Sequence, residues 1–359
     1  MLNTPLVFVG TYTETEGSQS EGIYVYRIDI SSGELMLERV IKDILNPSFL
    51  EIHPGGHFLY AVNEVQNHRG QAGGGVSAFS IESDQVNLLN DQSSQGSDPC
   101  YVSVEQTGRF ALVANYTSGR IAIFPIQPDG QLGAASDVLQ HTGSSVHPER
   151  QNGPHAHCIL PDPTNRFAIA VDLGLDKLLI YQMDLKDGKL YQHAEVHVRS
   201  GAGPRHLTFH PNGQLAYLIN ELNSTLISYR YDSEHGTFEE LQTVPALPQD
   251  FDGENLCADI HISPDGRYLY ASNRGHDSIV CFFIDQETGR LMYRNHTSTG
   301  GREPRNFAID PSGAFLLVAN QKTNNIVTFR IDAEGGRLSK TGHEVEVSMP
   351  VCLKFSHLK

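Results

Sequence analysis

Residues 203–221 read GPRHLTFHPNGQLAYLINE, and most of the chain repeats this pattern. Apolar and polar residues alternate in its first half, as they do in a half-buried β-strand. The Pro-Asn-Gly sequence at 211–213 favours a tight turn, because proline lacks an amide donor and Asn-Gly accepts positive φ. The apolar run 215–219 predicts a second strand that returns to Glu221. Arg205 and Glu221 are therefore predicted to lie at the same edge of one sheet.

Further copies of this pattern recur at intervals of about 50 residues, and they begin at Pro47, Pro99, Pro154, Cys257 and Pro304. Each copy is followed by a third, apolar strand, at residues 76–81, 121–126, 178–183, 226–231, 279–284 and 326–331. In several copies a turn such as Asp129-Gly130-Gln131-Leu132 and a more polar fourth strand come next. Four antiparallel strands per repeat of this length predict an all-β fold, a β-propeller.

The two ends of the chain supply the parts of a seventh blade. Residues 6–13 match the second strand of the repeat, residues 22–30 the third and residues 349–355 the first. We therefore expect a seven-bladed β-propeller with four antiparallel strands per blade, whose last blade is shared by the two termini and leaves no open edge. Linkers, low-complexity tracts and helical periodicity are absent from the sequence, so residues 1–359 are predicted to form a single domain.

Composition narrows the classes of function. The 359 residues carry a formal net charge of −16, which argues against a nucleic-acid or anionic-membrane surface. A small anionic ligand is compatible with this charge, because a few local arginines outweigh a distant, screened field. The N-terminus lacks the features of a signal peptide, and no apolar run approaches a membrane span. The five cysteines form no CxxC motif and are predicted to be reduced, in a cytoplasmic protein.

One edge of the predicted blades carries the long loops. Connections from the second to the third strand, and from the fourth strand to the next blade, share an edge. The longest loops are of these two kinds, at residues 64–75, 140–153 and 245–255. Ligand sites are expected at such an elaborated edge, while the opposite edge has short turns.

The residues expected at this edge differ from blade to blade. The position of Asn220 is nearly always asparagine, which hydrogen bonds to loop backbone would explain; Asn220 and Asn273 are nevertheless candidates for substrate binding. The position of Glu221 holds very different side chains, for which no shared structural duty is evident: Glu64, Tyr116, Leu173, Arg274 and Gln321. Of these, Glu64, Tyr116 and Gln321 are predicted to contact substrate.

His157 is the most unusual residue of the repeat. The alignment places it with apolar residues such as Leu207 and places His155 with Arg205. His157 could be a core histidine bonded to a backbone carbonyl, or a general acid or base, since imidazole titrates near neutral pH. His155 and His157 share a strand face and could bind a metal. No third ligand is evident and arginines would repel a cation, so no metal site is expected.

Other histidines have simpler interpretations. His206 is expected to pack between blades, and His210 and His261 to be structural. Three arginines, Arg205, Arg274 and Arg305, fall at the starts or ends of inner strands. They could form salt bridges within the edge, for example Arg205 with Glu221, or recognise phosphate or carboxylate and stabilise an oxyanion. No phosphate loop, nucleophile elbow or zinc motif accompanies them.

Several segments together resemble one known family: VGTYT, HPGGHFLYAVNE, VANYTSG, GPHAHCI, GPRHLTFHPNG, ISPDGRYLYASNRGHDSI and GGREPRNFAIDPSGAFLLVANQ. They are similar to the seven-bladed lactonase family, and the resemblance covers essentially the whole chain. Its bacterial members include the propeller-type 6-phosphogluconolactonases, and its fungal members include the carboxy-muconate lactonizing enzyme. The resemblance implies an enzyme that acts on a lactone without a metal or other cofactor.

The resemblance also implies a set of catalytic residues. The group proposed for the fungal branch falls by motif on His157 (or His155) in GPHAHCI, Arg205 in GPRHL, Glu221 in INEL and Arg274 in SNRG. The expected reaction is hydrolysis of 6-phospho-D-glucono-1,5-lactone to 6-phosphogluconate, in the pentose phosphate pathway, with His155 and Arg305 helping to bind the anionic substrate. The alternatives are a lactonase or cycloisomerase for another sugar or muconate lactone, and a propeller that only binds a partner.

Overall fold

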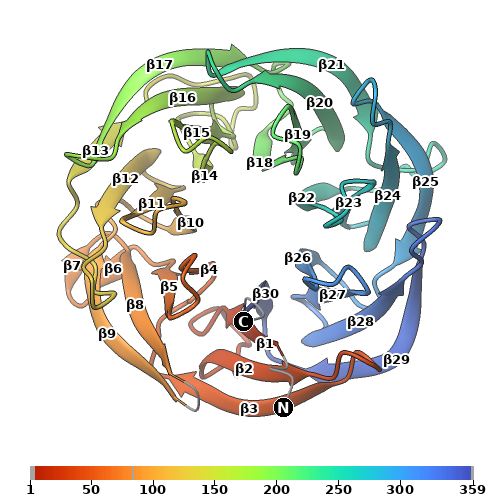
Figure 1. Ribbon diagram of the computed structural model, residues 1–359, viewed down its shortest axis with the longest axis horizontal. Coiled ribbons are helices and arrows are strands. Elements are labelled where there is room, and N and C mark those ends of the chain that lie inside the picture. Colours follow the sequence, from red (N-terminus) through yellow and green to blue (C-terminus); the bar gives the residue numbers. More distant parts are fainter. Residues whose placement is uncertain (1–4, 83–84, 357–359) are drawn as a thin grey trace. The chain divides into compact units, whose positions relative to one another are not determined.

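The computed structural model describes residues 5–82 and 85–356. Within these ranges the chain forms β-strands and no helix. The strands build seven sheets of four strands each and one small two-stranded hairpin (Figure 1). The predicted all-β fold with seven four-stranded blades is therefore confirmed.

The sheets fall into two compact units. The first unit contains the chain up to Asp43, His206–Asp232 and the part from Phe238 onward. The second unit contains Ile44–Arg205 and Ser233–Thr237. The expectation that residues 1–359 form a single domain stays a prediction.

The first unit contains the sheet built from both termini and three sheets from the second half of the chain. The shared sheet has the order β3-β2-β1-β30, with β1 (Leu6–Thr11), β2 (Gly22–Ile28), β3 (Leu35–Lys42) and β30 (Pro350–Phe355). The other three sheets follow chain order. One contains β18 (Pro204–Phe209), β19 (Leu215–Asn220), β20 (Thr225–Asp232) and β21 (Thr237–Pro245), and its strand β18 begins in the second unit. The next contains β22 (Leu256–Ile262), β23 (Tyr268–Arg274), β24 (Ser278–Ile284) and β25 (Leu291–Ser298), and the last contains β26 (Pro304–Ile309), β27 (Phe315–Asn320), β28 (Asn325–Ile331) and β29 (Leu338–Glu346).

The second unit contains three sheets and the hairpin. The sheets are β4 (Leu50–Ile52), β5 (Phe58–Asn63), β8 (Gly75–Glu82) and β9 (Gln85–Ser93); β10 (Pro99–Val104), β11 (Phe110–Asn115), β12 (Arg120–Pro125) and β13 (Asp137–Gln140); β14 (Ala156–Pro161), β15 (Phe167–Asp172), β16 (Lys177–Asp184) and β17 (Lys189–His197). The hairpin, β6 (Asn67–His68) and β7 (Gln71–Ala72), lies within the long loop after β5.

The two ends of the chain meet in one sheet. In Figure 1, β30 at the blue end of the chain lies beside β1 at the red end. Val9 pairs with Leu353 in the antiparallel ladder, and the Leu6 amide donates to Ser356 Oγ at 2.8 Å across 350 positions. The prediction that the termini share a blade is confirmed.

The turns between first and second strands are tight and pack on one another. The His210 amide donates to the Leu215 carbonyl at 2.9 Å, and Gly213 between them has φ of 71°. His210 Nε2 lies 2.8 Å from the carbonyl oxygen of Gly266, in the next turn of the first unit. A Cβ on Gly266 would come within 2.6 Å of that imidazole, so only glycine fits. The structural interpretation of His210 is confirmed.

The core lies along the second strands and between neighbouring sheets. Every residue of β15, β19 and β27 is buried, whereas all residues but one of the outer strand β17 are exposed or half-buried. Large side chains fill the space between adjacent sheets, for example Tyr270, Phe307 and Phe329 in the first unit. Full burial of such a side chain contributes about 1.5–3 kcal/mol, which makes the inner strands rigid supports for the loops at their ends.

Candidate active site

The second residue of the first strand in several blades is a functional candidate. β14, β18 and β26 have six residues each, and their second residues are His157, Arg205 and Arg305. Cys100 has the same place in β10. In β10, β14 and β26 the pairing with the second strand shifts at this residue, as it does at a β-bulge. Such bulges re-aim a side chain and are common beside active sites.

The register corrects one part of the repeat alignment. The alignment placed His155 with Arg205 and put His157 in a buried apolar position, and this is wrong. Ile159 pairs with Ala170 on β15 in the way that Val102 pairs with Val113 on β11. Ile159 therefore fills the apolar position and His157 the second position. The GPHAH segment has two more residues before its strand than GPR has.

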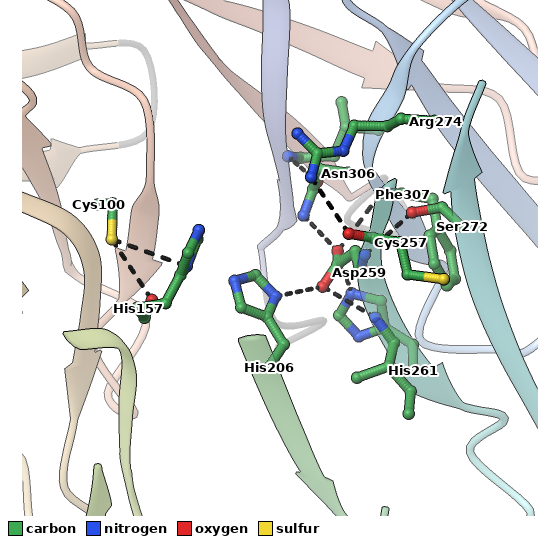
Figure 2. A network of polar contacts seen from close by, with 12 residues as sticks. Cys100, His157, His206, Cys257, Asp259, His261, Ser272, Arg274, Asn306 and Phe307 are labelled. Atoms are coloured by element: carbon green, nitrogen blue, oxygen red, sulfur yellow. Dashed lines mark hydrogen bonds and ion pairs between the residues drawn. The ribbon is translucent and has the colours of Figure 1, made fainter. Parts of the chain in front are cut away.

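His157 is enclosed within the second unit. The residue is 5% exposed, and its Nδ1 lies 3.7 Å from Cys100 Sγ (Figure 2). The Cys100 thiol also donates to the His157 carbonyl oxygen at 3.4 Å. The Tyr116 ring meets the imidazole edge-on, with ring centroids 5.5 Å apart. These contacts fix the orientation of the ring, and a general base needs such a fixed orientation.

His155 has a different environment. Its ring stacks on Tyr116 with centroids 4.5 Å apart, and its Nδ1 is 3.0 Å from the Tyr116 carbonyl oxygen. Its backbone amide donates to Asp172 Oδ1 at 2.8 Å. His155 thus packs against Tyr116 and orders the chain that leads to His157. This arrangement supports His157 rather than His155 as the acid–base candidate.

Asp172 stands where the other complete copies have asparagine. In four of those copies the asparagine side-chain amide donates to a backbone carbonyl of the segment between blades, as Asn273 does to Ala246. These bonds confirm the structural interpretation of the asparagine. Asp172 instead lies 2.6 Å from His141 Nδ1, and both side chains are fully buried. Its other oxygen accepts the amides of His155 and Leu175. A carboxylate suits this place because all its neighbours are donors.

Arg150 contacts the same tyrosine as His157, and the repeat pattern does not single it out. Its Nη2 donates to the Tyr116 hydroxyl at 3.1 Å. Arg150 belongs to the loop between β13 and β14, which is longer than the equivalent connections between the other blades. The one available signal was the length of that loop. Arg205, by contrast, was predicted, and it is buried at 2% exposure in the second unit.

Glu221 and Arg274 form an ion pair in the first unit. Arg274 Nη2 is 2.8 Å from Glu221 Oε2, and both side chains are buried. The same nitrogen donates to the Cys257 carbonyl oxygen at 3.2 Å. Arg274 ends β23, and Glu221 directly follows β19. The ends of β19 and β23, in neighbouring sheets, thus bring together two residues that the family resemblance implies to be catalytic.

The remaining predicted residues also lie at or next to the ends of the first or second strands of their blades. Asn220 is fully buried, and its amide donates to Thr225 Oγ1. Arg305 is half-buried, with its guanidinium 5.5 Å from the centre of the Tyr12 ring. Glu64 and Gln321 are half-buried and follow β5 and β27. Contact of these residues with substrate stays a prediction.

A cavity of about 300 Å³ lies beside Arg274 in the first unit. Its charged lining consists of the cations Arg274, Arg302 and Lys322 and the carboxylates Glu254, Asp277 and Glu303. Lys322 and Glu303 form an ion pair at 2.6 Å. Because positive and negative groups balance, the cavity suits polar, uncharged parts of a ligand better than a dianion.

A buried carboxylate network joins several strands of the first unit. Asp259 on β22 accepts hydrogen bonds from His206 Nδ1 at 2.8 Å, from His261 Nε2 at 2.9 Å and from the Asn306 amide (Figure 2). Burial by itself raises the pKa of the Asp259 carboxyl. The charge of His261 and the hydrogen bonds of both histidines outweigh burial and hold this pKa well below its usual range. The structural interpretation of His206 and His261 is confirmed.

The structure brings the predicted catalytic residues together in two groups. His157, Tyr116 and His155 are in contact in the second unit, which also holds Arg205; Glu221 and Arg274 are paired in the first. Action of all four catalytic candidates on one substrate stays a prediction. Among residues 5–82 and 85–356, no three His, Cys, Asp or Glu side chains are grouped as metal ligands. The same residues include no helix with the length and apolar character that crossing a membrane requires.

Known proteins are similar to this chain over nearly its full length. A 6-phosphogluconolactonase of Bacillus subtilis strain 168 is 40% identical over 352 residues, which cover 98% of each chain. The Pseudomonas aeruginosa periplasmic gluconolactonase PpgL has a structure with a TM-score of 0.92 and 34% identity, covering 99% of this chain and 100% of its own. A Bacteroides fragilis protein has a TM-score of 0.91 and 38% identity, with 99% and 98% coverage.

Residues 6–355 match the family described as "Lactonase, 7-bladed beta-propeller". This match agrees with the seven four-stranded sheets. The chain therefore belongs to the family of seven-bladed β-propeller lactonases.

Proposed function

We propose that this protein hydrolyses 6-phospho-D-glucono-1,5-lactone to 6-phospho-D-gluconate, a step of the pentose phosphate pathway. The observation that carries the proposal is the 40% identity to the Bacillus subtilis 6-phosphogluconolactonase over 98% of both chains. The enclosed His157 and the Glu221–Arg274 pair give this family member the acid–base and cationic groups that opening a lactone requires.

The reaction adds water to the lactone carbonyl. A water oxygen bonds to carbon 1 while His157 accepts one of its protons, and the carbonyl oxygen becomes an oxyanion. Arg205 supplies positive charge to that oxyanion. The bond between carbon 1 and the ring oxygen then breaks, and the His157 imidazolium returns its proton to the ring oxygen, which becomes the 5-hydroxyl group. The new carboxylic acid loses a proton to water.

Glu221 and Arg274 have complementary roles in this proposal. Arg274 is held at 2.8 Å by the Glu221 carboxylate, so its guanidinium is fixed before the substrate arrives. Fixed donors stabilise developing charge without reorganisation during the reaction. Glu221 is the alternative base if His157 serves only to orient water. General base catalysis of this kind contributes about 10²–10⁴-fold.

The test is a hydrolysis assay with 6-phosphoglucono-1,5-lactone, corrected for spontaneous opening and repeated with a chelator. We expect turnover that the chelator does not change. His157→Ala and Arg205→Ala should each lower kcat/KM by about 10²-fold or more, and melting curves show whether each variant is still folded, because both side chains are buried. Full activity in both variants would contradict the site, and no turnover by the wild type would contradict the function.

A lactonase for unphosphorylated sugar lactones is the second candidate. The similarity to the Pseudomonas aeruginosa protein named gluconolactonase favours it. A substrate panel of 6-phosphogluconolactone, gluconolactone and a muconolactone separates these candidates from each other and from a cycloisomerase. The cytoplasmic location, the absence of a cofactor and the absence of nucleic-acid or membrane partners stay predictions.

A further inference from the structure

A compact loop holds Arg150 in place. The Ser145 amide donates to the Gln151 carbonyl at 2.9 Å, and the Gln151 amide donates to the His147 carbonyl at 3.0 Å. The buried Gln151 side chain donates to the Leu173 carbonyl at 2.8 Å and so ties the loop to the segment after β15. The Arg150 amide donates to His147 Nδ1 at 3.1 Å. These bonds fix the backbone from which the guanidinium extends.

One tyrosine links Arg150 to His157. Arg150 Nη2 donates to the Tyr116 hydroxyl at 3.1 Å, while the Tyr116 ring meets His157 edge-on and stacks on His155. The guanidinium contacts the polar tip of the tyrosine, and the two imidazoles contact its ring. Arg150 and His157 therefore contact different parts of the same tyrosine.

We propose that Arg150 binds the phosphate group of the substrate and thereby sets the preference for a phosphorylated lactone. This inference rests on the proposed function. If His157 acts at carbon 1, the phosphate is separated from that carbon by the ring oxygen, carbon 5, carbon 6 and the ester oxygen, so a group other than His157 is needed to bind it. A guanidinium is permanently charged, and its planar donors match phosphate oxygens in pairs. The cavity beside Arg274 is a poorer phosphate site because three carboxylates line it together with three cations.

The test compares 6-phosphoglucono-1,5-lactone with glucono-1,5-lactone in the wild type and in Arg150→Gln. The lost charge-assisted contact should lower kcat/KM for the phospholactone about 10- to 100-fold, mainly through KM, and change kcat/KM for gluconolactone by less than about 3-fold. Arg150→Lys keeps the charge without the paired donors, so its loss should be intermediate. Melting temperatures show whether each variant is folded.

Two further variants separate phosphate binding from mere support of Tyr116. Tyr116→Phe removes the hydroxyl that Arg150 contacts and keeps the guanidinium, so the preference for the phospholactone should persist. Arg120→Gln is the matched control, because Arg120 is an exposed arginine of the same blade bonded to Gln140 and Gln95. Equal losses on both substrates in Arg150→Gln would overturn this inference alone. A wild type inactive on both substrates would overturn the proposed function with it.

Discussion

The buried pair of Glu221 and Arg274 links chemistry to stability at the scale of single residues. The side chains are 4% and 6% exposed, and the two charges lie 2.8 Å apart. Removing one partner of a buried pair leaves the other charge uncompensated, which costs about 3–5 kcal/mol, whereas replacing both is often nearly neutral. The pair is therefore expected to show strong energetic coupling.

Arg274→Met should lower the free energy of unfolding by about 3 kcal/mol because it removes the guanidinium that pairs with the buried Glu221 carboxylate. The double variant Glu221→Gln/Arg274→Met should regain most of this stability and remain inactive. Urea unfolding of the wild type, both single variants and the double variant measures the coupling. Additive losses in the double variant would show that the pair does not stabilise the fold as a unit.

The cysteine thiols should be inert in the native protein. All five are buried and free of disulfides in the structure, and their reduced state stays a prediction. Burial raises the pKa of Cys257 to about 12 and that of Cys281 to about 12, so almost no thiolate exists at pH 8. Iodoacetamide at pH 8 should label neither residue until the protein is denatured, as mass spectrometry of peptides would show. Rapid labelling of either residue in the native state would contradict this burial.

Asp259 connects four strands of the first unit at the scale of elements. It binds His206 on β18, His261 on its own strand β22 and Asn306 on β26, and Asn306 Oδ1 accepts the Leu353 amide of β30. The carboxylate stays ionised although it is buried, because the histidines favour the charged form. One side chain thus holds the first strands of neighbouring blades in register.

Asp259→Asn should lower the free energy of unfolding at pH 7 by about 3 kcal/mol. The folded carboxyl has the lower pKa, so its contribution is complete above the unfolded pKa of about 3.9. It fades as the pH falls below that value toward the folded pKa. Urea unfolding of both proteins between pH 7 and pH 3 measures the difference. A difference that grows as the solution becomes more acidic would contradict this assignment.

Periodicity predicted the strands but not their irregularities. The alternation of apolar and polar residues located nearly every strand, because each blade buries the same positions. The shift in pairing at the second residue of β14 leaves no trace in that alternation. The GPHAH segment also has two extra residues, which preserve the alternation, so periodicity alone places the HAH doublet two residues away from the position that the pairing of Ile159 with Ala170 gives it.

The shared sheet matters at the scale of the whole molecule. β30 covers the edge of β1, and an uncovered strand edge is a template for aggregation. A chain that ends at Ser348 should therefore be insoluble or misfolded. A synthetic peptide of residues 349–356 added during refolding should restore soluble protein in size-exclusion chromatography. The same peptide with Leu353→Pro should fail, because proline cannot donate to the Asn306 side chain.

The fold was more predictable than the site for a physical reason. Six copies of one pattern report the same strand order independently, so local errors cancel. A site depends on single side chains from segments that are far apart in sequence. Glu221 and Arg274 were found because they differ from the residues at the same positions of the other copies, whereas Arg150 lies in a loop whose extra length has no equivalent in the other copies. The Asp259 network was not predicted, because the sequence does not show that His206 and His261 bind the same carboxylate.

The pairing of β1 with β30 also fixes an order of events during protein synthesis. β1 leaves the ribosome at the start of translation, and its partner follows only after more than 300 further residues. At about 5–20 residues per second, this delay is tens of seconds. A nascent chain keeps the β1 edge open throughout that time and needs chaperone cover. A prematurely terminated chain lacks β30, so its β1 edge stays open to pairing with other chains.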